Sequence, residues 1–113
     1  MPCIFCEIVA GRAPASIVYK DEQVTAFNDL HPRAPTHILI IPNRHIESLH
    51  AVTDDASAVQ VAKCLRVARD LAEERGLNGG YRIVTNVGAD AGQSVFHLHF
   101  HLLAGRKMSW PPG

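Results

Sequence analysis

The chain has 113 residues, of which 47% are hydrophobic and 19% charged, proportions of a folded globular protein rather than a disordered one. Its 11 basic and 11 acidic residues give zero formal net charge, so there is no overall electrostatic basis for a nucleic acid or an acidic membrane as partner. No apolar stretch is long enough to span a bilayer, and neither a secretory signal nor a disulfide framework is evident. We therefore expect one cytoplasmic domain over residues 1–113.

Short apolar runs bounded by polar turn residues predict five strands. In chain order, these strands cover residues 16–20, 24–28, 37–41, 81–87 and 95–103. The first two flank the polar pair Asp21-Glu22, which is typical of a hairpin, and the third ends at Pro42. One or two helical turns are also expected within residues 3–10, and Gly11 would end them.

A long helix is predicted near residues 54–75. Apolar side chains recur there at helical spacing, at Ala58, Val61, Ala62, Leu65, Ala68 and Ala72. Thr53 is the expected N-cap, and Gly76 is a natural stop. Because the strands mostly follow one another without a helix between them, we expect the α+β class, with a five-stranded antiparallel sheet, one long helix and one short helix. The two prolines after Trp110 exclude the C-terminal end from a helix or a sheet interior.

Three of the seven histidines lie within five residues of the last predicted strand, at His97, His99 and His101. Successive side chains of a strand point to opposite faces, so the three imidazoles share one face while Leu98 and Phe100 point into the core. Such a row can bind a metal, hold an anion such as phosphate, or supply a nucleophile with helpers. A solvated polar face is the remaining interpretation, and three identical uncommon residues on one face disfavour it.

The segment before this strand, residues 88–94, contains two glycines and ends at Ser94. Glycines allow backbone N–H groups to approach a ligand closely, and the serine adds a hydroxyl beside the imidazoles. Taken alone, the segment would be a turn between two strands. Combined with the imidazole row, it predicts a phosphate site.

The pair Cys3-x-x-Cys6 has the spacing of zinc ligands. A zinc site needs two further ligands, and the histidines of the chain supply candidates. The alternatives are two small residues in an apolar helical turn, or a labile disulfide. Cys64 lies in the predicted long helix without a cysteine partner, so we expect it to be a buried core residue.

The segment His97-Leu-His99-Phe-His101-Leu-Leu103 resembles the signature of the histidine triad (HIT) superfamily, in which histidines alternate with apolar residues. The resemblance covers nearly the whole chain. Further matching segments are Gly92-Gln93-Ser94-Val95, Ala34-Pro35-Thr36-His37, Ile41-Pro42 with His45, and the terminal Trp110-Pro111-Pro112-Gly113. These segments are similar to the branch of histidine triad nucleotide-binding proteins.

The resemblance implies a fold, an assembly and an activity. Family members have a five-stranded antiparallel sheet with two helices, and they pair as homodimers whose sheets join. Members of this branch hydrolyse purine nucleoside 5′-phosphoramidates, so the implied activity is that of an adenosine 5′-monophosphoramidase, with AMP, GMP or their derivatives as ligands. Related transferases carry Gln at the position of His101, so the histidine here favours hydrolysis. Trp110 is expected at the dimer interface, near the partner's active site.

The resemblance also assigns roles to individual residues. By position, the nucleophile on phosphorus would be His99, with His101, His37 and Ser94 as the other catalytic residues. The ribose and phosphate would be bound by Asp29, Asn86, Gly92, Gln93 and Ser94, together with His99 and His101. The base would lie among Ile4, Phe5, Ile8 and Phe27. A structural zinc ion would be held by Cys3, Cys6, His45 and His97, with no catalytic cofactor.

The chemistry has a physical basis, and several alternatives stay open. A neutral imidazole is a competent nucleophile at pH 7 when an acceptor, often a backbone carbonyl, holds its second nitrogen. One alternative is a metal-dependent hydrolase with zinc on the triad, although no Asp or Glu base lies close by in sequence. The others are a dinucleoside polyphosphate hydrolase and a non-catalytic nucleotide-binding regulatory dimer. Ser94 and the short C-terminus with Trp110 favour phosphoramidates over polyphosphates.

Overall fold

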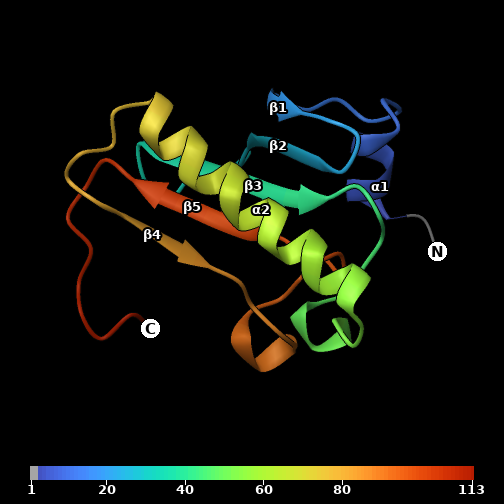
Figure 1. Cartoon of the computed structure of the whole chain (residues 1–113). Coiled ribbons are helices and arrows are strands. Elements are labelled where there is room, and N and C mark those ends of the chain that lie inside the picture. Colours follow the sequence, from blue (N-terminus) through green and yellow to red (C-terminus); the bar gives the residue numbers. More distant parts are fainter. Residues whose placement is uncertain (1–2) are drawn as a thin grey trace.

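The computed structural model describes residues 3–113, which form one antiparallel sheet with a long and a short helix (Figure 1). The strands are β1 (Ile17–Lys20), β2 (Val24–Asn28), β3 (Thr36–Pro42), β4 (Tyr81–Val84) and β5 (Phe100–Ala104). The helices are α1 (Ile4–Val9) and α2 (Asp55–Glu74), with short 3-10 helices η1 (Leu49–Ala51) and η2 (Ala89–Ala91). The strand order is β1-β2-β3-β5-β4, and every neighbouring pair is antiparallel. The predicted α+β class is confirmed.

Strand β3 lies in the middle of the sheet and is buried on both faces. Ile38 and Ile40 pack in the larger core beneath α2, whereas Leu39 and Ile41 pack in a smaller core with Phe5 of α1. Figure 1 shows α2 running diagonally across one face of the sheet, with α1 set apart from it near the N-terminus. Because both faces are covered, β3 is a continuous apolar run rather than an alternation of apolar and polar residues.

The N-cap of α2 differs from the predicted one. Asp54 is the N-cap, and its carboxylate accepts a hydrogen bond of 2.8 Å from the backbone N–H of Ser57. The Ser57 hydroxyl in turn accepts from the backbone N–H of Asp54, which completes a capping box. The prediction of Thr53 was wrong because threonine and aspartate are both good N-caps, and only the reciprocal partner three positions later separates the two.

The buried face of α2 also departs from the predicted stripe. Ala68 and Ala72 are buried as expected, but Ala58, Ala62 and Leu65 are exposed. The buried residues of the helix are Ser57, Cys64, Val67, Ala68, Leu71 and Ala72. The prediction followed the alanines, which are small enough for either face of a helix. The larger side chains of Val67 and Leu71 define the face that packs on the sheet.

The last two strands are shorter than predicted. Strand β4 ends at Val84 rather than at residue 87, and β5 begins at Phe100 rather than at residue 95. Backbone groups in this region bond outside the sheet ladder: the carbonyl of His99 accepts from the Thr85 hydroxyl at 2.8 Å, and the N–H of Leu98 donates to the Ile46 carbonyl at 2.6 Å. These bonds replace the strand pairing that the alternating sequence predicts.

The alternation of faces nevertheless continues through residues 97–101. Leu98 and Phe100 are buried in the larger core beneath α2. The rings of His97 and His99 lie on the opposite side, edge-on to Phe5 of the smaller core. The predicted separation of imidazoles from apolar residues therefore holds, although most of this segment lies outside the strand.

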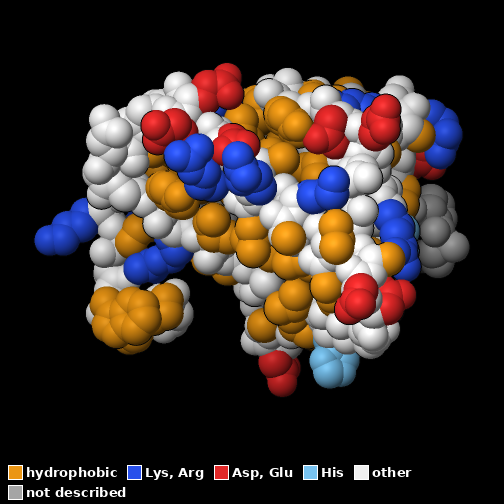
Figure 2. Space-filling model, in the orientation of Figure 1, with side chains coloured by type: hydrophobic (Ala, Val, Ile, Leu, Met, Phe, Trp, Pro, Cys, Tyr) orange, Lys and Arg blue, Asp and Glu red, His pale blue; other side chains and the backbone are white. Residues whose placement is uncertain are grey.

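The segment after β5 has neither helix nor strand, as its prolines predict. Gly105 begins it with φ of +95°, and a Cβ at this position would lie 2.8 Å from the Cβ of Pro35, so the turn requires glycine. Trp110 is 81% exposed. Figure 2 shows a hydrophobic group that stands away from the body of the molecule where Figure 1 marks the C-terminus. Within residues 3–113, no helix combines the length and the hydropathy needed to cross a bilayer.

Candidate functional site

A cavity of about 500 Å³ opens between α1, the end of β2 and the residues that lead into β5. Its apolar lining consists of Ile4, Phe5, Ile8, Ala13, Pro14, Ala15, Phe27, Leu30, Leu39 and Val95. Its polar lining consists of Asn28, Asp29, His31, Ser94, His99 and His101. The volume falls in the range of small-molecule sites. The lining joins an apolar compartment to a group of polar side chains, which fits a ligand with a flat apolar part and a charged part.

His99 is held in one tautomer by its own chain. Its side chain is buried, and Nδ1 lies 2.7 Å from the backbone carbonyl of His97. A carbonyl oxygen only accepts hydrogen bonds, so Nδ1 carries the proton. The lone pair of the neutral ring is therefore on Nε2. This is the arrangement that a nucleophilic imidazole requires, on a ring that lines the cavity.

A second chain of hydrogen bonds fixes the tautomers of His37 and His101. The backbone N–H of Arg33 donates to His37 Nδ1 at 3.0 Å, so the proton of a neutral His37 is on Nε2. That nitrogen lies 2.8 Å from His101 Nδ1 and 3.4 Å from a carboxylate oxygen of Asp29. His101 Nδ1 accepts, and its own proton is consequently on Nε2. His101 thus offers an N–H donor, whereas His99 offers a lone pair.

The imidazoles of His37 and His101 are kept neutral chiefly by burial. Burial, with smaller contributions from the neighbouring His99 and His37 rings, lowers the pKa of His101 to about 4, although the Asp29 carboxylate acts in the opposite direction. Burial also lowers the pKa of His37, again against the Asp29 carboxylate. Both rings therefore act as neutral donors and acceptors near pH 7 rather than as cations.

The structure places the predicted loop residues in different roles. Ser94 lines the cavity, but Asn86, Gly92 and Gln93 do not. The buried amide of Gln93 accepts from the N–H of Gly88 at 2.9 Å and donates to the carbonyls of Glu47 and Val95 at 2.9 and 3.1 Å. These bonds hold the loop before β5 in place, so the Gln93 amide is occupied by backbone groups rather than directed at a ligand.

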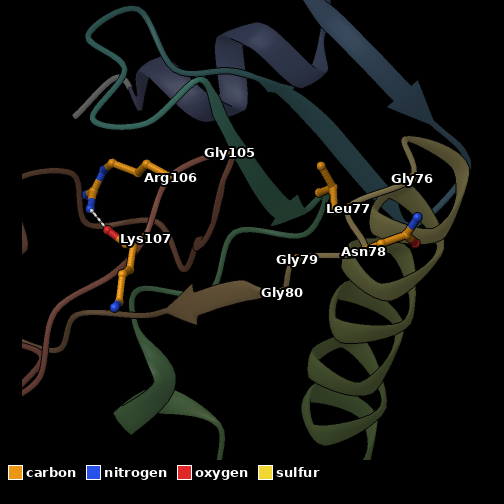
Figure 3. Close-up of a pocket in the computed structure, with 8 residues that line it drawn as sticks. All are labelled: Gly76, Leu77, Asn78, Gly79, Gly80, Gly105, Arg106 and Lys107. Atoms are coloured by element: carbon orange, nitrogen blue, oxygen red, sulfur yellow. Dashed lines mark hydrogen bonds between the residues drawn. The ribbon is translucent and has the colours of Figure 1, made fainter.

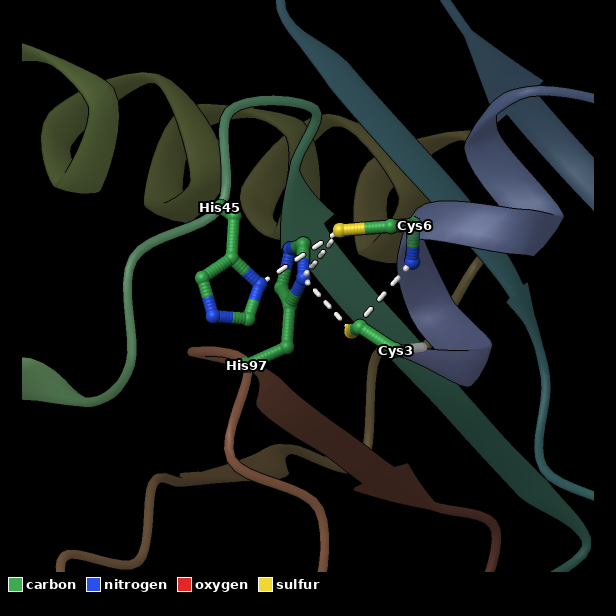
Figure 4. A group of neighbouring side chains, drawn as sticks. All are labelled: Cys3, Cys6, His45 and His97. Carbon is green, nitrogen blue, oxygen red and sulfur yellow. Dashed lines mark hydrogen bonds between the residues drawn. The ribbon is translucent and has the colours of Figure 1, made fainter. Parts of the chain in front are cut away.

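Beside the cavity, four side chains bring together atoms that could hold a metal ion (Figure 4). The sulfur and ring-nitrogen atoms of Cys3, Cys6, His45 and His97 all lie within 4.8 Å of one another. Nδ1 of His97 is 3.4 Å from the Cys3 sulfur and 3.6 Å from the Cys6 sulfur, and Nδ1 of His45 is 3.4 Å from the Cys6 sulfur. Zinc bonds of about 2.3 Å to sulfur and about 2.0 Å to nitrogen place such tetrahedral ligands about 3.5 Å apart.

The hydrogen bonding of these residues is consistent with a metal-binding state. His97 Nε2 lies 2.8 Å from the Pro42 carbonyl, so Nε2 carries the proton and the Nδ1 lone pair faces the two sulfurs. Burial and the neighbouring Cys3 thiol raise the pKa of Cys6, which disfavours two adjacent thiolates without a cation. The other cysteine, Cys64, is buried in the core as predicted, and burial raises its pKa to about 12.

The atoms of Asp29, His37 and His101 also approach within 4.8 Å of one another. Here the hydrogen bonding disfavours a metal. Because the N–H of Arg33 occupies His37 Nδ1, His37 Nε2 carries a proton instead of a lone pair for an ion. The group is an internal hydrogen-bond chain, and this weighs against a metal-dependent hydrolase centred on these histidines.

Sequence reasoning missed the backbone groups that fix the rings. The N–H of Arg33 and the carbonyls of Pro42 and His97 orient three imidazoles, yet a backbone group has no side-chain signature. The only usable signal was the two-residue spacing of His97 and His99, across which the His97 carbonyl reaches Nδ1 of His99.

A second hollow, of about 450 Å³, lies beyond the other end of β5, between residues 76–80 and 105–107 (Figure 3). Its charged residues are Arg106 and Lys107, without a titratable group of neutral-pH chemistry. The Arg106 guanidinium donates to the carbonyls of Arg33 and Lys107. Of these two hollows, the cavity with the histidines is therefore the candidate functional site.

We predict that His101 stays neutral down to about pH 5, because burial lowers its pKa to about 4. The pKa in the folded protein lies below the ordinary histidine value of 6.5. Acidification below that value thus protonates the unfolded chain first and lowers the free energy of unfolding until the folded pKa is reached. NMR titration of the His101 ring proton, identified with His101→Gln, measures this pKa, and Asp29→Asn should lower it further. A ring that titrates near 6.5 would contradict the prediction.

Comparison with known proteins identifies the family. The HIT domain matches residues 10–108 of the chain. The "14 kDa zinc-binding protein" of Zea mays is 44% identical over 125 aligned positions, which cover 99% of this chain and 88% of that protein. The crystal structure of a HIT family hydrolase from Legionella pneumophila Philadelphia 1 matches with a TM-score of 0.94 and 49% identity, over 99% of this chain and 100% of that one. A histidine triad nucleotide-binding protein from Candida albicans matches with a TM-score of 0.82 and 32% identity, over 97% of this chain and 83% of that one. The chain belongs to the HIT domain family.

Proposed function

We propose that the protein hydrolyses purine nucleoside 5′-phosphoramidates through a covalent nucleotidyl intermediate on His99. The observation that carries this proposal is the hydrogen bond from His99 Nδ1–H to the His97 carbonyl, which leaves a lone pair on Nε2 of a ring that lines a nucleotide-sized cavity. The names of the Legionella hydrolase and of the Candida nucleotide-binding protein support the same reaction class and ligand class.

The lining of the cavity supports a placement for each part of such a substrate. The base fits the apolar compartment formed by Phe5, Ile8 and Phe27, where aromatic rings provide flat packing surfaces. The Asp29 carboxylate is an acceptor for ribose hydroxyls. The phosphate then falls on the histidine side of the cavity. There His101 offers its Nε2–H as a neutral hydrogen-bond donor.

The reaction proceeds in two displacements at phosphorus. In the first, His99 Nε2 forms a bond to phosphorus while the bond from phosphorus to the amine breaks, and the amine leaves with a proton relayed by the Ser94 hydroxyl or by His101. The imidazole becomes cationic, and its Nδ1–H donates to the His97 carbonyl more strongly than before. In the second, water forms the new phosphorus–oxygen bond and returns one proton to the group that protonated the amine. The bond to Nε2 breaks, and the nucleoside 5′-monophosphate is released with a neutral His99.

Replacing the nucleophile tests this mechanism. His99→Ala should lower kcat/KM for adenosine 5′-phosphoramidate by roughly three orders of magnitude or more, since the neighbouring rings of His37, His97 and His101 carry their protons on Nε2. His50→Ala, which removes an exposed imidazole, is the matched control. Mass spectrometry of acid-quenched wild-type protein should detect one added nucleoside monophosphate on His99. Normal turnover by His99→Ala would rule the mechanism out, and dinucleoside polyphosphates assayed in parallel define the leaving group.

We also infer that Cys3, Cys6, His45 and His97 bind a structural zinc ion. The two sulfur and two nitrogen donors, their mutual distances and the tautomer of His97 fit tetrahedral zinc. The printed name of the maize relative, a zinc-binding protein, supports this assignment. Because four protein ligands fill the coordination sphere, the ion would have no open position for a substrate or water. It would instead hold α1 against the rest of the fold.

Metal analysis of the purified protein tests the zinc assignment. Under conditions free of chelators, we expect one zinc ion per chain, and Cys3→Ser with Cys6→Ser should abolish it because the remaining imidazoles bind too weakly. Cys64→Ala is the matched control, since that thiol is buried in the core away from the cluster, and it should retain the metal. Wild-type protein without zinc after saturation with the ion would remove the assignment.

Finally, we infer a homodimer in which the sheets join and the C-terminal segment reaches the partner. Strand β4 is an edge strand of the sheet, and edge strands have unpaired backbone groups. Trp110 is 81% exposed, and a large aromatic side chain with no core of its own is typical of an interface anchor. The Arg82 side chain ties this tail to β4 through a hydrogen bond to the Ser109 carbonyl.

Light scattering during gel filtration tests the assembly. We expect a mass of twice 12.3 kDa for the wild type. Trp110→Ala should weaken the dimer and reduce turnover, because it removes the most exposed apolar surface of the tail. Val59→Ala, which shortens an exposed side chain of α2, is a control for the general loss of apolar surface. A wild-type monomer at all accessible concentrations would contradict the inference.

A further inference from the structure

Helix α1 belongs to two sites at once. It has six residues, and isolated helices of this length are not stable in water. Cys3 is its N-cap and Cys6 lies in its first turn, so both sulfur atoms of the Cys/His cluster come from this helix. Ile4, Phe5 and Ile8 of the same helix line the cavity. Whatever holds the two sulfurs in place therefore also determines where this wall of the cavity lies.

Phe5 is the side chain that touches both sites. Its ring lies edge-on to His97 of the cluster, with centroids 5.9 Å apart, and edge-on to His99 of the cavity, with centroids 5.2 Å apart. It also packs against Phe27 at 5.4 Å. Phe5 is 7% exposed, so a displacement of its ring must be accommodated by these neighbours. In sequence it lies between the two cysteines.

His97 provides a second link. Its Nδ1 faces the sulfur atoms of Cys3 and Cys6, and its Nε2–H donates to the Pro42 carbonyl. Its backbone carbonyl is the group that holds His99 Nδ1 at 2.7 Å. One fully buried residue therefore contributes its ring to the cluster and its carbonyl to the tautomer of His99.

We propose that Phe5, acting with His97, couples metal binding to nucleotide binding, so that each ligand strengthens the binding of the other. Phe5 is a positioning residue in this scheme, because it sets the orientation of the His99 ring and the shape of the base compartment. The proposal rests on the nucleotide ligand and the zinc ion proposed above. It adds that the two sites form one energetic unit rather than two neighbours.

The coupling has a direct thermodynamic consequence. If zinc tightens the binding of AMP by some factor, AMP must tighten the binding of zinc by the same factor. Couplings of this kind are commonly about fivefold to about a hundredfold, and with two packed links we expect about tenfold. The factor by which zinc strengthens AMP binding and the factor by which AMP strengthens zinc binding must therefore be equal, which provides an internal check. If the metal only prevented unfolding, AMP would leave the zinc affinity of the folded protein unchanged.

The experiment measures the affinity of the protein for zinc by equilibrium competition with a chromogenic chelator, with and without saturating AMP. For the wild type, we expect AMP to tighten zinc binding about tenfold. Calorimetry should show AMP binding weakened by the same factor after zinc removal, with circular dichroism confirming the fold. Phe5→Leu should remove most of the effect of AMP on the zinc affinity. Phe27→Leu is the matched control, because Phe27 lines the same cavity but does not lie between the two cysteines in sequence. This variant should bind AMP more weakly, while AMP should still strengthen zinc binding.

The outcomes separate this proposal from the proposed function. If AMP binds but the affinity for zinc is unchanged, or if Phe5→Leu and Phe27→Leu behave alike, the coupling is overturned while the function stands. If AMP does not bind, the proposed nucleotide function fails. NMR of the imidazole rings, recorded with and without zinc, then tests whether the metal cluster affects His99. Removal of zinc should shift the ring resonances of His99, whereas an unchanged His99 signal would overturn the coupling. Failure of the folded protein to bind added zinc would overturn it as well.

Discussion

The hydrogen bond between His99 Nδ1 and the His97 carbonyl limits the chemistry that is open to this protein. It decides which nitrogen of the ring carries the proton, and it joins residues only two positions apart. The bond therefore depends on the path of the backbone between them. That backbone is held by Leu98, whose side chain is buried beneath α2 and whose N–H donates to the Ile46 carbonyl. The tautomer thus follows from a core contact on the opposite face, and no carboxylate is needed to orient the ring.

Desolvation gives the site its electrostatic character. Burial is the main cause of the lowered pKa values of His37, His97 and His101, and neutral rings can pack close together without mutual repulsion. A phosphate in this cavity would meet oriented neutral donors rather than a cluster of cations. Such donors require little reorganisation as charge develops on the phosphoryl oxygens, and this is the usual source of electrostatic catalysis in a sheltered site.

The sequence predicted the elements, and several residues that it singled out line the cavity, because its strongest signals are local. Alternation separated the imidazoles from Leu98 and Phe100, and the apolar run at residues 37–41 predicted the strand that became β3. It failed where non-local partners decide. Strand β5 starts later than predicted because backbone groups before it form hydrogen bonds with Ile46 and Thr85. The amide of Gln93 forms hydrogen bonds with backbone groups around its own loop. The cysteine and histidine cluster was implied only through the family resemblance, because residues as far apart as 3 and 97 meet only in the folded chain.

Alternate residues of β3 face two different parts of the molecule. Ile38 and Ile40 belong to the core beneath α2, whereas Leu39 lines the cavity on the other side. A change at Leu39 can reshape the ligand compartment without touching the larger core, and a change at Ile38 can alter stability without altering the compartment. Mutations that reshape the cavity and mutations that change the packing of the larger core can therefore accumulate at adjacent positions of one strand nearly independently. Such a layout allows a small scaffold to diversify its chemistry while its architecture is inherited intact.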